Sequence, residues 1–312
     1  MTSPRRARVR ALAKINLDLR VLGKRPDGYH ELRTIFQTVS LADSLDIAFR
    51  PGRKTVVELQ DSLAIPDNLV TRAAHSALEA MRIGGRVEMR LVKRIPMGAG
   101  LGGGSSDAAA VLLALPVLAG RRLDLPTLAS LAEQLGSDVP FFLLGGRAVG
   151  IGRGTELFPL PDGAAQNGIV VASGVHVSTA QAYRDLGPHL TSESQENKIF
   201  SFQAQVWGRS VGALPRNDFE EVVFRQHRSL AAIKRKLLRA GASVALMTGS
   251  GSAVFGLFPD RNGISAALQS WGAQTAFPVS LVSRTRYRQM WWRALREHST
   301  GRTWPPPSRY AR

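Results

Sequence analysis

The residues of this chain that are best suited to chemistry form a glycine-rich loop. Five of the seven residues in 98–104 are glycine. Because glycine adopts positive φ and has no side chain, the backbone N–H groups of such a loop can approach an anion closely, and phosphate is the expected guest. Ser105, Ser106 and Asp107 follow, with side chains that can cap an alanine-rich helix over 108–115. The loop therefore lies at the positive end of a helix dipole, which also favours phosphate.

Two common phosphate-binding motifs fit this loop poorly. Gly98, Gly100 and Gly103 satisfy the spacing GxGxxG, but the preceding strand, 87–95, alternates apolar and charged residues. This alternation predicts a half-exposed antiparallel strand, whereas a dinucleotide-binding fold requires a fully buried parallel one. Gly104 stands where a Walker A loop requires lysine. Since a flexible linker would not run directly into a capped helix, we interpret the loop as a phosphate site of a third kind.

A predicted strand over 9–21 carries Lys14, Asn16 and Asp18 on one face, because apolar residues alternate with them. This pattern leaves two interpretations open. The polar face is either an ordinary solvated strand face or part of a functional site.

Three other segments carry residues suited to a site. A Pro-Asp-Gly turn delivers Tyr29 and His30 to the start of the next element. Asp138 stands between a small polar residue and the apolar run 139–142, and it is either a helix cap or a catalytic base. The loop 248–252, with the sequence TGSGS, joins two apolar strands. It is either a hairpin turn or a second small-residue loop that closes against phosphates.

The composition is that of a globular protein in a reducing compartment. The chain has 312 residues, of which 44% are hydrophobic, and this is enough for two domains. It has no cysteine, which excludes disulfides, cysteine-ligated metals and thiol nucleophiles. The longest apolar run, 108–115, is shorter than the roughly 20 residues that span a bilayer, and we see no signal-peptide core. We expect a cytoplasmic protein without a membrane partner.

The chain carries a formal net charge of +17, from 41 basic and 24 acidic residues. Such a balance attracts anions, so nucleotides, phosphorylated metabolites and nucleic acid are all candidate partners, while an arginine-rich genome would produce the same excess. The segment 286–312 is rich in Arg, Trp and Pro and has no clear periodicity. There we expect a basic C-terminal tail, either disordered or a basic aromatic arm.

The hydrophobic patterns predict an α+β protein of two domains, with a boundary in the polar, turn-rich stretch 159–168. Pro116 is expected to end or kink the helix that follows the glycine loop. The predicted strands lie at 9–21, 35–39, 45–49, 55–59, 87–95, 169–172, 243–247, 253–258 and 278–282, and the predicted helices at 68–81, 108–115, 126–135, 179–186, 263–271 and within 218–240.

Four segments together resemble the GHMP kinases, which are named for galactokinase and for homoserine, mevalonate and phosphomevalonate kinases. They are AKINLDLRVLGKRPDGYHEL at 13–32, PMGAGLGGGSSDAAA at 96–110, GSDVPFF at 136–142 and TGSGSAVF at 248–255. The resemblance extends over about residues 8–285 and implies a two-domain GHMP kinase fold. Its N-terminal ATP-binding domain, ribosomal S5 domain 2-like, would span 1–160, and its C-terminal domain, a ferredoxin-like α/β sandwich, would span 161–285.

The resemblance implies an ATP-dependent kinase that phosphorylates an alcohol. Among GHMP kinases, the four segments are most similar to the branch that phosphorylates the 2-hydroxyl of a cytidine diphosphate derivative of methylerythritol, in non-mevalonate isoprenoid synthesis. Asp138 would be the catalytic base. Lys14 would favour the ionised form of that carboxylate and offset charge on the transferred phosphoryl group. Mg²⁺ would accompany ATP, with Ser105 or Ser106 as a candidate ligand.

The resemblance also assigns the binding residues. Tyr183 would stack on the cytosine, and Lys93 would lie beside the adenosine. The substrate-binding residues would be Asn16, Tyr29, His30, Thr179 and Tyr183, and the residues that support the closed loop Gly249, Ser250 and Gly251. The ATP-binding residues would be Lys93, Pro96, Met97, Gly98, Ala99, Gly100, Leu101, Gly102, Gly103, Gly104, Ser105 and Ser106.

Two alternatives stay open at this point. The first is another GHMP kinase, acting on homoserine or mevalonate, against which the GYHEL stretch and the cytosine-stacking aromatic argue. The second is a basic nucleic-acid-binding protein, because the N-terminal domain shares its architecture with nucleic-acid-associated modules. Binding to phosphates would not require Asp138 opposite Lys14, so we expect a small-molecule substrate rather than nucleic acid, and a monomer or homodimer.

Overall fold

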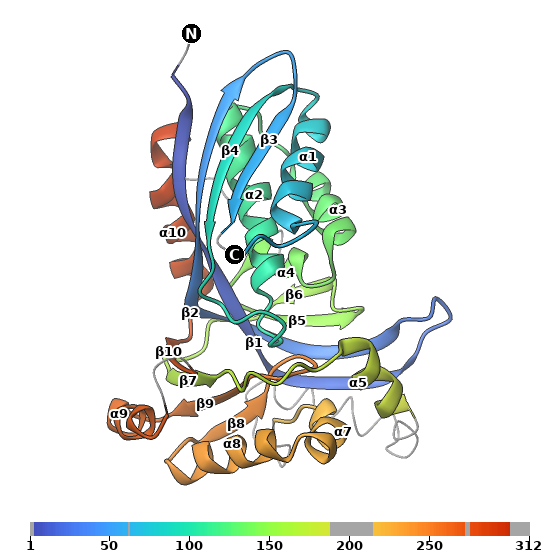
Figure 1. Ribbon diagram of the computed structural model, residues 1–312, viewed down its shortest axis with the longest axis vertical. Helices are drawn as coiled ribbons and strands as arrows, with labels where there is room; N and C mark the ends of the chain where they lie inside the picture. The colour runs from blue at the N-terminus through green and yellow to red at the C-terminus, as the bar shows by residue number, and fades with distance from the viewer. Residues whose placement is uncertain (1–2, 62, 188–214, 272–274, 300–312) are drawn as a thin grey trace.

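The computed structural model describes residues 3–61, 63–187, 215–271 and 275–299. The chain forms two halves, each with its own sheet and helices, which lie one above the other in Figure 1. No helix within these ranges is long and apolar enough to cross a bilayer. Residues 300–312 of the expected tail lie outside the described part of the chain.

The N-terminal half is a six-stranded sheet with helices α1 to α4 on one side (Figure 1). β2 pairs antiparallel with β1, β4 and β5. Along β4, buried Val87, Met89 and Leu91 alternate with exposed charged residues, which confirms the half-exposed strand expected there. The strand is antiparallel to β2, as expected, but parallel to β3. The elements are β1 (Arg5–Lys24), β2 (His30–Pro51), β3 (Val56–Asp61), α1 (Leu69–Met81), β4 (Gly85–Val92), α2 (Gly103–Ala119), α3 (Leu125–Leu135), α4 (Val139–Leu144), β5 (Arg147–Gly152) and β6 (Glu156–Pro159).

The C-terminal half is a four-stranded antiparallel sheet in the order β10-β7-β9-β8. This order, with helices between β7 and β8 and between β9 and β10, is the ferredoxin-like arrangement that the resemblance implied. One face of the sheet packs on helices, and the other packs on the β1–β2 hairpin. The elements are β7 (Asn167–Val171), α5 (Thr179–Leu186), α7 (Phe219–Gln226), α8 (Arg228–Arg239), β8 (Val244–Met247), β9 (Val254–Phe258), α9 (Arg261–Gln269) and β10 (Ala276–Ser280).

The β1–β2 hairpin belongs to both cores. It is longer than the sequence predicts, because the strands expected separately at 35–39 and 45–49 form the single strand β2. An irregularity in the β1–β2 pairing between Leu12 and Lys14 lets the ladder continue where the alternation of apolar residues breaks. Leu12 packs in the core of the N-terminal half, whereas Ile15 packs against the C-terminal sheet. The Lys14 side of β1 is thereby brought to the junction of the two halves.

Helix α2 begins before the alanine-rich run. Its N-cap is Gly102, with φ +69° and no side-chain capping bond. The prediction that Ser105, Ser106 and Asp107 cap the helix is therefore wrong, because these residues lie inside the helix, which begins at Gly103. The helix dipole still begins at the glycine loop, as expected.

Pro116 lies inside α2, and the prediction that it ends the helix is wrong. The helix continues to Ala119 and ends at Gly120, which adopts φ +68°. Pro116 removes one backbone N–H from the last turns of the helix, but residues 106–118 are buried on every side. Tertiary packing therefore outweighs the local preference of proline.

The expected C-terminal tail is wrong for residues 286–298, which are folded. They belong to helix α10 (Arg284–Leu295), which Ser283 caps, and to the short 3₁₀ helix Arg296–His298. Tyr287, Trp291 and Leu295 recur every four residues and are buried in the core of the N-terminal half. The Tyr287 hydroxyl donates a hydrogen bond to the Phe142 carbonyl at 2.5 Å. Helical periodicity thus exists here among residues whose basic and aromatic composition is typical of a tail.

We predict that Trp291→Ala lowers the free energy of unfolding by about 3–5 kcal/mol, since it leaves a large cavity in the core. Arg293→Ala, on the exposed side of the same helix, should change it by less than about 0.5 kcal/mol. Chemical denaturation of the two variants measures the difference. Equal, small effects would show that α10 contributes nothing to the core.

Candidate active site

A cavity of about 970 Å³ opens at the junction of the two halves. β1, the glycine loop, the segment before α4, helix α5 and the loop 248–252 all contribute to its wall. Residues far apart in the sequence thus meet at one place. The sequence-predicted residues that line it are Lys14, Asn16, Tyr29, His30, Gly98, Gly100, Ser105, Asp138, Thr179, Tyr183, Gly249, Ser250 and Gly251.

Other predicted ATP-binding residues do not line this cavity. Ala99 and Leu101 are buried in the apolar cluster between the halves, and Met97 is exposed. Alternate residues of the loop thus anchor it, while Gly98 and Gly100 face the cavity. The predicted residues away from the cavity wall are Lys93, Pro96, Met97, Ala99, Leu101, Gly102, Gly103, Gly104 and Ser106.

The Lys14 ammonium and the Asp138 carboxylate face each other across the floor of the cavity. Lys14 Nζ lies 3.4 Å from Asp138 Oδ2 and donates a hydrogen bond to Asn16 Oδ1 at 2.8 Å. Asp138 precedes α4, but its side chain makes no capping hydrogen bond. It is about one-third exposed, whereas the Lys14 side chain is 4% exposed. The arrangement therefore favours the interpretation of Asp138 as a base over that of a helix cap.

The Asn16 carboxamide connects Lys14 to the C-terminal half. Asn16 Oδ1 accepts hydrogen bonds from Lys14 Nζ and from the Gly249 N–H, the latter at 2.9 Å. Asn16 Nδ2 donates to Thr34 Oγ1 at 2.7 Å. The polar face of β1 is therefore buried and fully engaged, and the alternative of a solvated strand face is wrong.

The glycine loop contains three residues in the left-handed region, Gly98, Gly100 and Gly102. At Gly100, with φ +76°, an added Cβ would also overlap the carbonyl oxygen of Thr248. The loop consequently touches the loop 248–252 of the other half with no room for a side chain between them. Glycine is required there both by conformation and by close approach.

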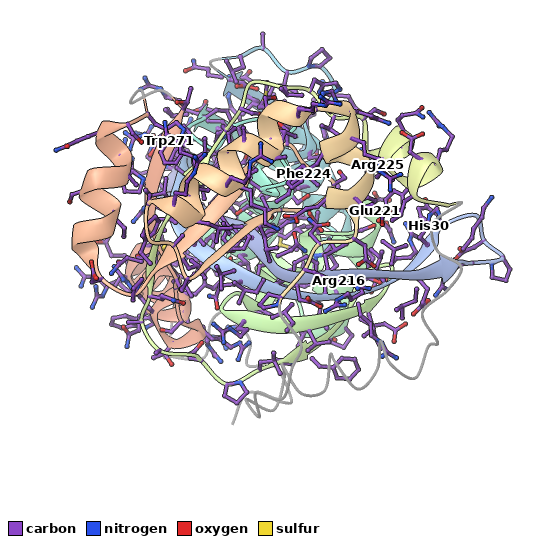
Figure 2. The ribbon with its side chains drawn as sticks, turned by 90° about the horizontal axis from the view of Figure 1, so that it is seen from below. His30, Arg216, Glu221, Phe224, Arg225 and Trp271 are labelled. Atoms are coloured by element: carbon purple, nitrogen blue, oxygen red, sulfur yellow. The ribbon has the colours of Figure 1, made fainter. Side chains whose placement is uncertain are left out.

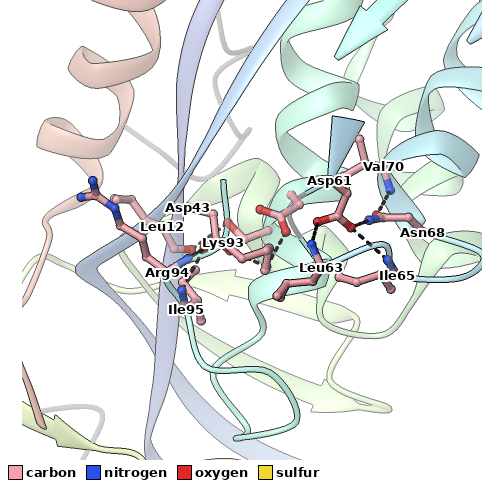
Figure 3. Close-up of polar contacts among 12 residues, drawn as sticks. Leu12, Asp43, Asp61, Leu63, Ile65, Asn68, Val70, Lys93, Arg94 and Ile95 are labelled. Atoms are coloured by element: carbon pink, nitrogen blue, oxygen red, sulfur yellow. Dashed lines mark hydrogen bonds and ion pairs between the residues drawn. The ribbon is translucent and has the colours of Figure 1, made fainter. Parts of the chain in front are cut away.

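A buried ion-pair cluster supports the base of the glycine loop (Figure 3). Lys93 Nζ lies 2.5 Å from Asp43 Oδ2 and 2.6 Å from Asp107 Oδ2. Asp43 Oδ1 also accepts from the N–H groups of Arg94 and Ile95. Burial raises the pKa of Asp107 to about 7, against the lowering effect of the Lys93 charge. Lys93 thus has a structural role beneath the loop, and its contact with adenosine stays a prediction.

Aromatic rings gather at the far end of the cavity, beside the hairpin tip. The rings of His30 and Tyr183 stack with centroids 4.5 Å apart, and Phe219 meets Tyr183 edge-on at 4.8 Å. Figure 2 shows His30 on the hairpin near α5. Burial and the Lys24 charge lower the pKa of His30, which favours neutral imidazole. The Arg153 guanidinium lies 3.6 Å from the centroid of the Tyr29 ring.

Basic side chains dominate the cavity wall, and sequence reasoning missed most of them. Lys14, Lys24, Arg153 and Arg184 line it, and Asp138 is the single carboxylate among the described lining residues. No local pattern distinguishes these lysines and arginines from the others in a chain that carries 41 basic residues. The excess positive charge suits a ligand with several phosphates.

Comparison with known proteins places the chain in a family. Residues 68–146 match the GHMP kinases N terminal domain, and residues 202–276 match the GHMP kinases C terminal domain. A 4-diphosphocytidyl-2-C-methyl-D-erythritol kinase of Solibacter usitatus is 67% identical over 99% of both chains. The chain belongs to the GHMP kinase family. Its resemblance to GHMP kinases, their two-domain fold and their kinase class are thereby confirmed.

Other relatives agree with this assignment. The enzyme of the same name from Pelotomaculum thermopropionicum is 43% identical, over 80% of this chain and 88% of its own length. A crystal structure titled 4-(cytidine 5'-diphospho)-2C-methyl-D-erythritol kinase superposes with a TM-score of 0.73 at 39% identity, over 88% of this chain and 98% of that one. A homoserine kinase from Cytophaga hutchinsonii, 18% identical with a TM-score of 0.64 over 91% and 96% of the two chains, shares the fold.

We predict that Gly100→Ala lowers the free energy of unfolding by about 1–3 kcal/mol, because the methyl group forces the loop away from Thr248. Gly104→Ala is the matched control: it lies within α2, where the nearest atom to a new Cβ is Leu69 Cδ1 at 3.8 Å. That variant should equal or exceed the wild-type stability, since alanine favours a helix. Denaturant titration of both variants tests the expected order, and the reverse order would contradict the contact between the two loops.

Proposed function

We propose that this protein phosphorylates the 2-hydroxyl of 4-diphosphocytidyl-2-C-methyl-D-erythritol with ATP, giving the 2-phosphate and ADP, in non-mevalonate isoprenoid precursor synthesis. The observation that carries the proposal is the Lys14–Asp138 pair on the floor of a cavity with the glycine loop at one side and the aromatic rings at the other. The names of the relatives supply the substrate.

Asp138 acts as the general base in this proposal. A tertiary alcohol is a poor nucleophile at neutral pH, so a carboxylate that accepts its proton lowers the barrier. The Lys14 ammonium, held by Asn16, offsets the negative charge that develops as the phosphoryl group is transferred. Its hydrogen bond to Asn16 keeps it at a fixed position, which makes the stabilisation preorganised.

The phosphates of ATP bind at the glycine loop and the start of α2. Gly98 and Gly100, both with positive φ, line the cavity, and the dipole of α2 favours negative charge at its start. Thr179 Oγ1 and Ser250 Oγ share a hydrogen bond of 2.8 Å at the edge of the cavity, which supports a role for the loop 248–252 in closing the site.

The cytidine end of the substrate binds at the aromatic rings. The proposed cytosine extends the stack of His30 and Tyr183, and neutral imidazole both donates and accepts hydrogen bonds. Arg153 Nε is buried with no hydrogen-bond partner among the described residues, so the substrate's diphosphate is a fitting partner for it. Tyr29, beneath the Arg153 guanidinium, completes this end.

Magnesium fits the site as a companion of ATP. Among the described residues there is no cluster of three or more His, Asp or Glu side chains able to hold a metal, and Mg²⁺ bound by substrate phosphates needs only one or two protein ligands. Ser106 Oγ donates to the Leu12 carbonyl at 2.7 Å and is buried. Ser105 lines the cavity, so we propose Ser105 as the ligand. When bound, the ion neutralises phosphate charge.

We propose that the protein acts as a monomer or as a homodimer. The lack of cysteine fits the reducing cytoplasm as its compartment.

A coupled assay of ADP release tests the substrate directly. We expect turnover with the cytidine diphosphate derivative of methylerythritol, and none above background with homoserine or mevalonate at equal concentration. Release of ADP with the latter two alone would contradict the proposal. A polynucleotide added in place of an alcohol serves as the control for the basic charge of the chain.

We predict that Asp138→Asn lowers kcat by about 10²- to 10⁴-fold, the usual contribution of a positioned general base. ATP binding, measured by calorimetry, should be retained because in this proposal Asp138 acts on the alcohol and not on the phosphates of ATP. Asp67→Asn, at a side chain that is 80% exposed, is the matched control and should have wild-type kcat. If Asp138→Asn stayed within about threefold of wild type, positioning alone would account for the rate.

A further inference from the structure

Thr248 lies where three segments of the chain meet. The residue is fully buried. Its Oγ1 accepts a hydrogen bond from the Asn16 N–H at 3.1 Å, and it lies 3.2 Å from the Gly100 carbonyl oxygen and 3.1 Å from Asn16 Oδ1. The hydroxyl of this residue of the loop 248–252 thus contacts two other segments. One is β1, the strand that carries Lys14, and the other is the glycine loop.

The hydroxyl has a single proton for two acceptors. Asn16 Oδ1 already accepts from Lys14 Nζ and from the Gly249 N–H, so its two lone pairs are engaged. The Gly100 carbonyl is therefore the better acceptor, and Thr248 bridges the Asn16 N–H to the Gly100 carbonyl. A chain of hydrogen bonds then runs from Gly100 through Thr248 and Asn16 to Lys14, and Lys14 forms an ion pair with Asp138.

The surroundings hold Thr248 at this point. The Ala253 N–H donates to the Ala99 carbonyl at 3.1 Å, which joins the two loops a second time. On the other side, Asn217 Nδ2 donates to the carbonyls of Met247 and Gly249 at 2.7 and 2.8 Å. Hydrogen bonds of neighbouring residues therefore hold the backbone around Thr248 in place on both sides.

We propose that Thr248 is a positioning residue whose hydroxyl sets the distance between the glycine loop and the Lys14–Asp138 pair. In-line phosphoryl transfer depends on that distance, because misplacement by about 1 Å costs about 10²-fold in rate. The proposal rests on the proposed kinase function. It adds that the C-terminal half contributes to the rate through this contact and not only to substrate binding.

The test compares a variant of Thr248 that lacks the hydroxyl with a variant that keeps it. Thr248→Val keeps the shape and removes the hydroxyl, and Thr248→Ser keeps the hydroxyl. We expect Thr248→Val to lower kcat by about 10- to 100-fold, with KM for the cytidine substrate within threefold, since the aromatic end of the cavity is untouched. Thr248→Ser should recover kcat to within threefold of wild type.

Thr38→Val is the matched control, because Thr38 is fully buried and its Oγ1 has no hydrogen-bond partner among the described residues. It should keep wild-type kcat. If Thr248→Val does not fold, Thr248→Ala against Thr248→Ser makes the same comparison. Wild-type kcat in a folded Thr248→Val or Thr248→Ala, or equal losses in the variants with and without the hydroxyl, would overturn the proposal.

The two proposals fail in different ways. Kinetics are measured with whichever alcohol the wild type phosphorylates, so a different substrate would contradict the proposed function and leave the Thr248 comparison intact. Wild-type turnover of the cytidine substrate with an unaffected Thr248→Val would contradict the positioning role alone.

Discussion

The buried ammonium of Lys14 is the constraint on which the rest of the site depends. A charge removed from water is tolerated only where partners replace its solvation. Asn16 supplies one partner from the same strand, and Asp138 supplies the other from the start of α4. Because Asn16 Oδ1 also accepts the Gly249 N–H, solvating this one charge fixes β1, α4 and the loop 248–252 relative to one another.

The hairpin that carries Lys14 is shared by the two cores, and this explains where the cavity lies. Val9 and Leu45 pack with the helices of the N-terminal half, whereas Ile15 packs with the C-terminal sheet. Separation of the halves would expose apolar surface along one continuous strand. The junction is therefore a stable place for a site whose groups come from both halves.

Charge is arranged in layers around the glycine loop. Cations line the cavity above it, and beneath it Lys93 is paired with two carboxylates. Because burial raises the pKa of Asp107, this cluster carries less negative charge than two fully ionised carboxylates beside one ammonium group would. It can therefore anchor the loop with little repulsion of a phosphate, while the cavity wall and the start of α2 supply the attraction.

The sequence by itself determined the features that depend on local conformation. Glycine spacing indicated the loop, because its residues adopt left-handed backbone conformations that only glycine adopts readily. The ranges predicted for α1, α5 and β9 were correct to within a residue, because caps and apolar periodicity act over a few residues. Tertiary structure decided what depends on distant partners: the folding of α10 around Trp291, the ion pairs of Lys93 and the contacts of Thr248. Burial and hydrogen-bond partners come from segments far apart in the chain, and no local pattern encodes which buried surface a side chain will meet.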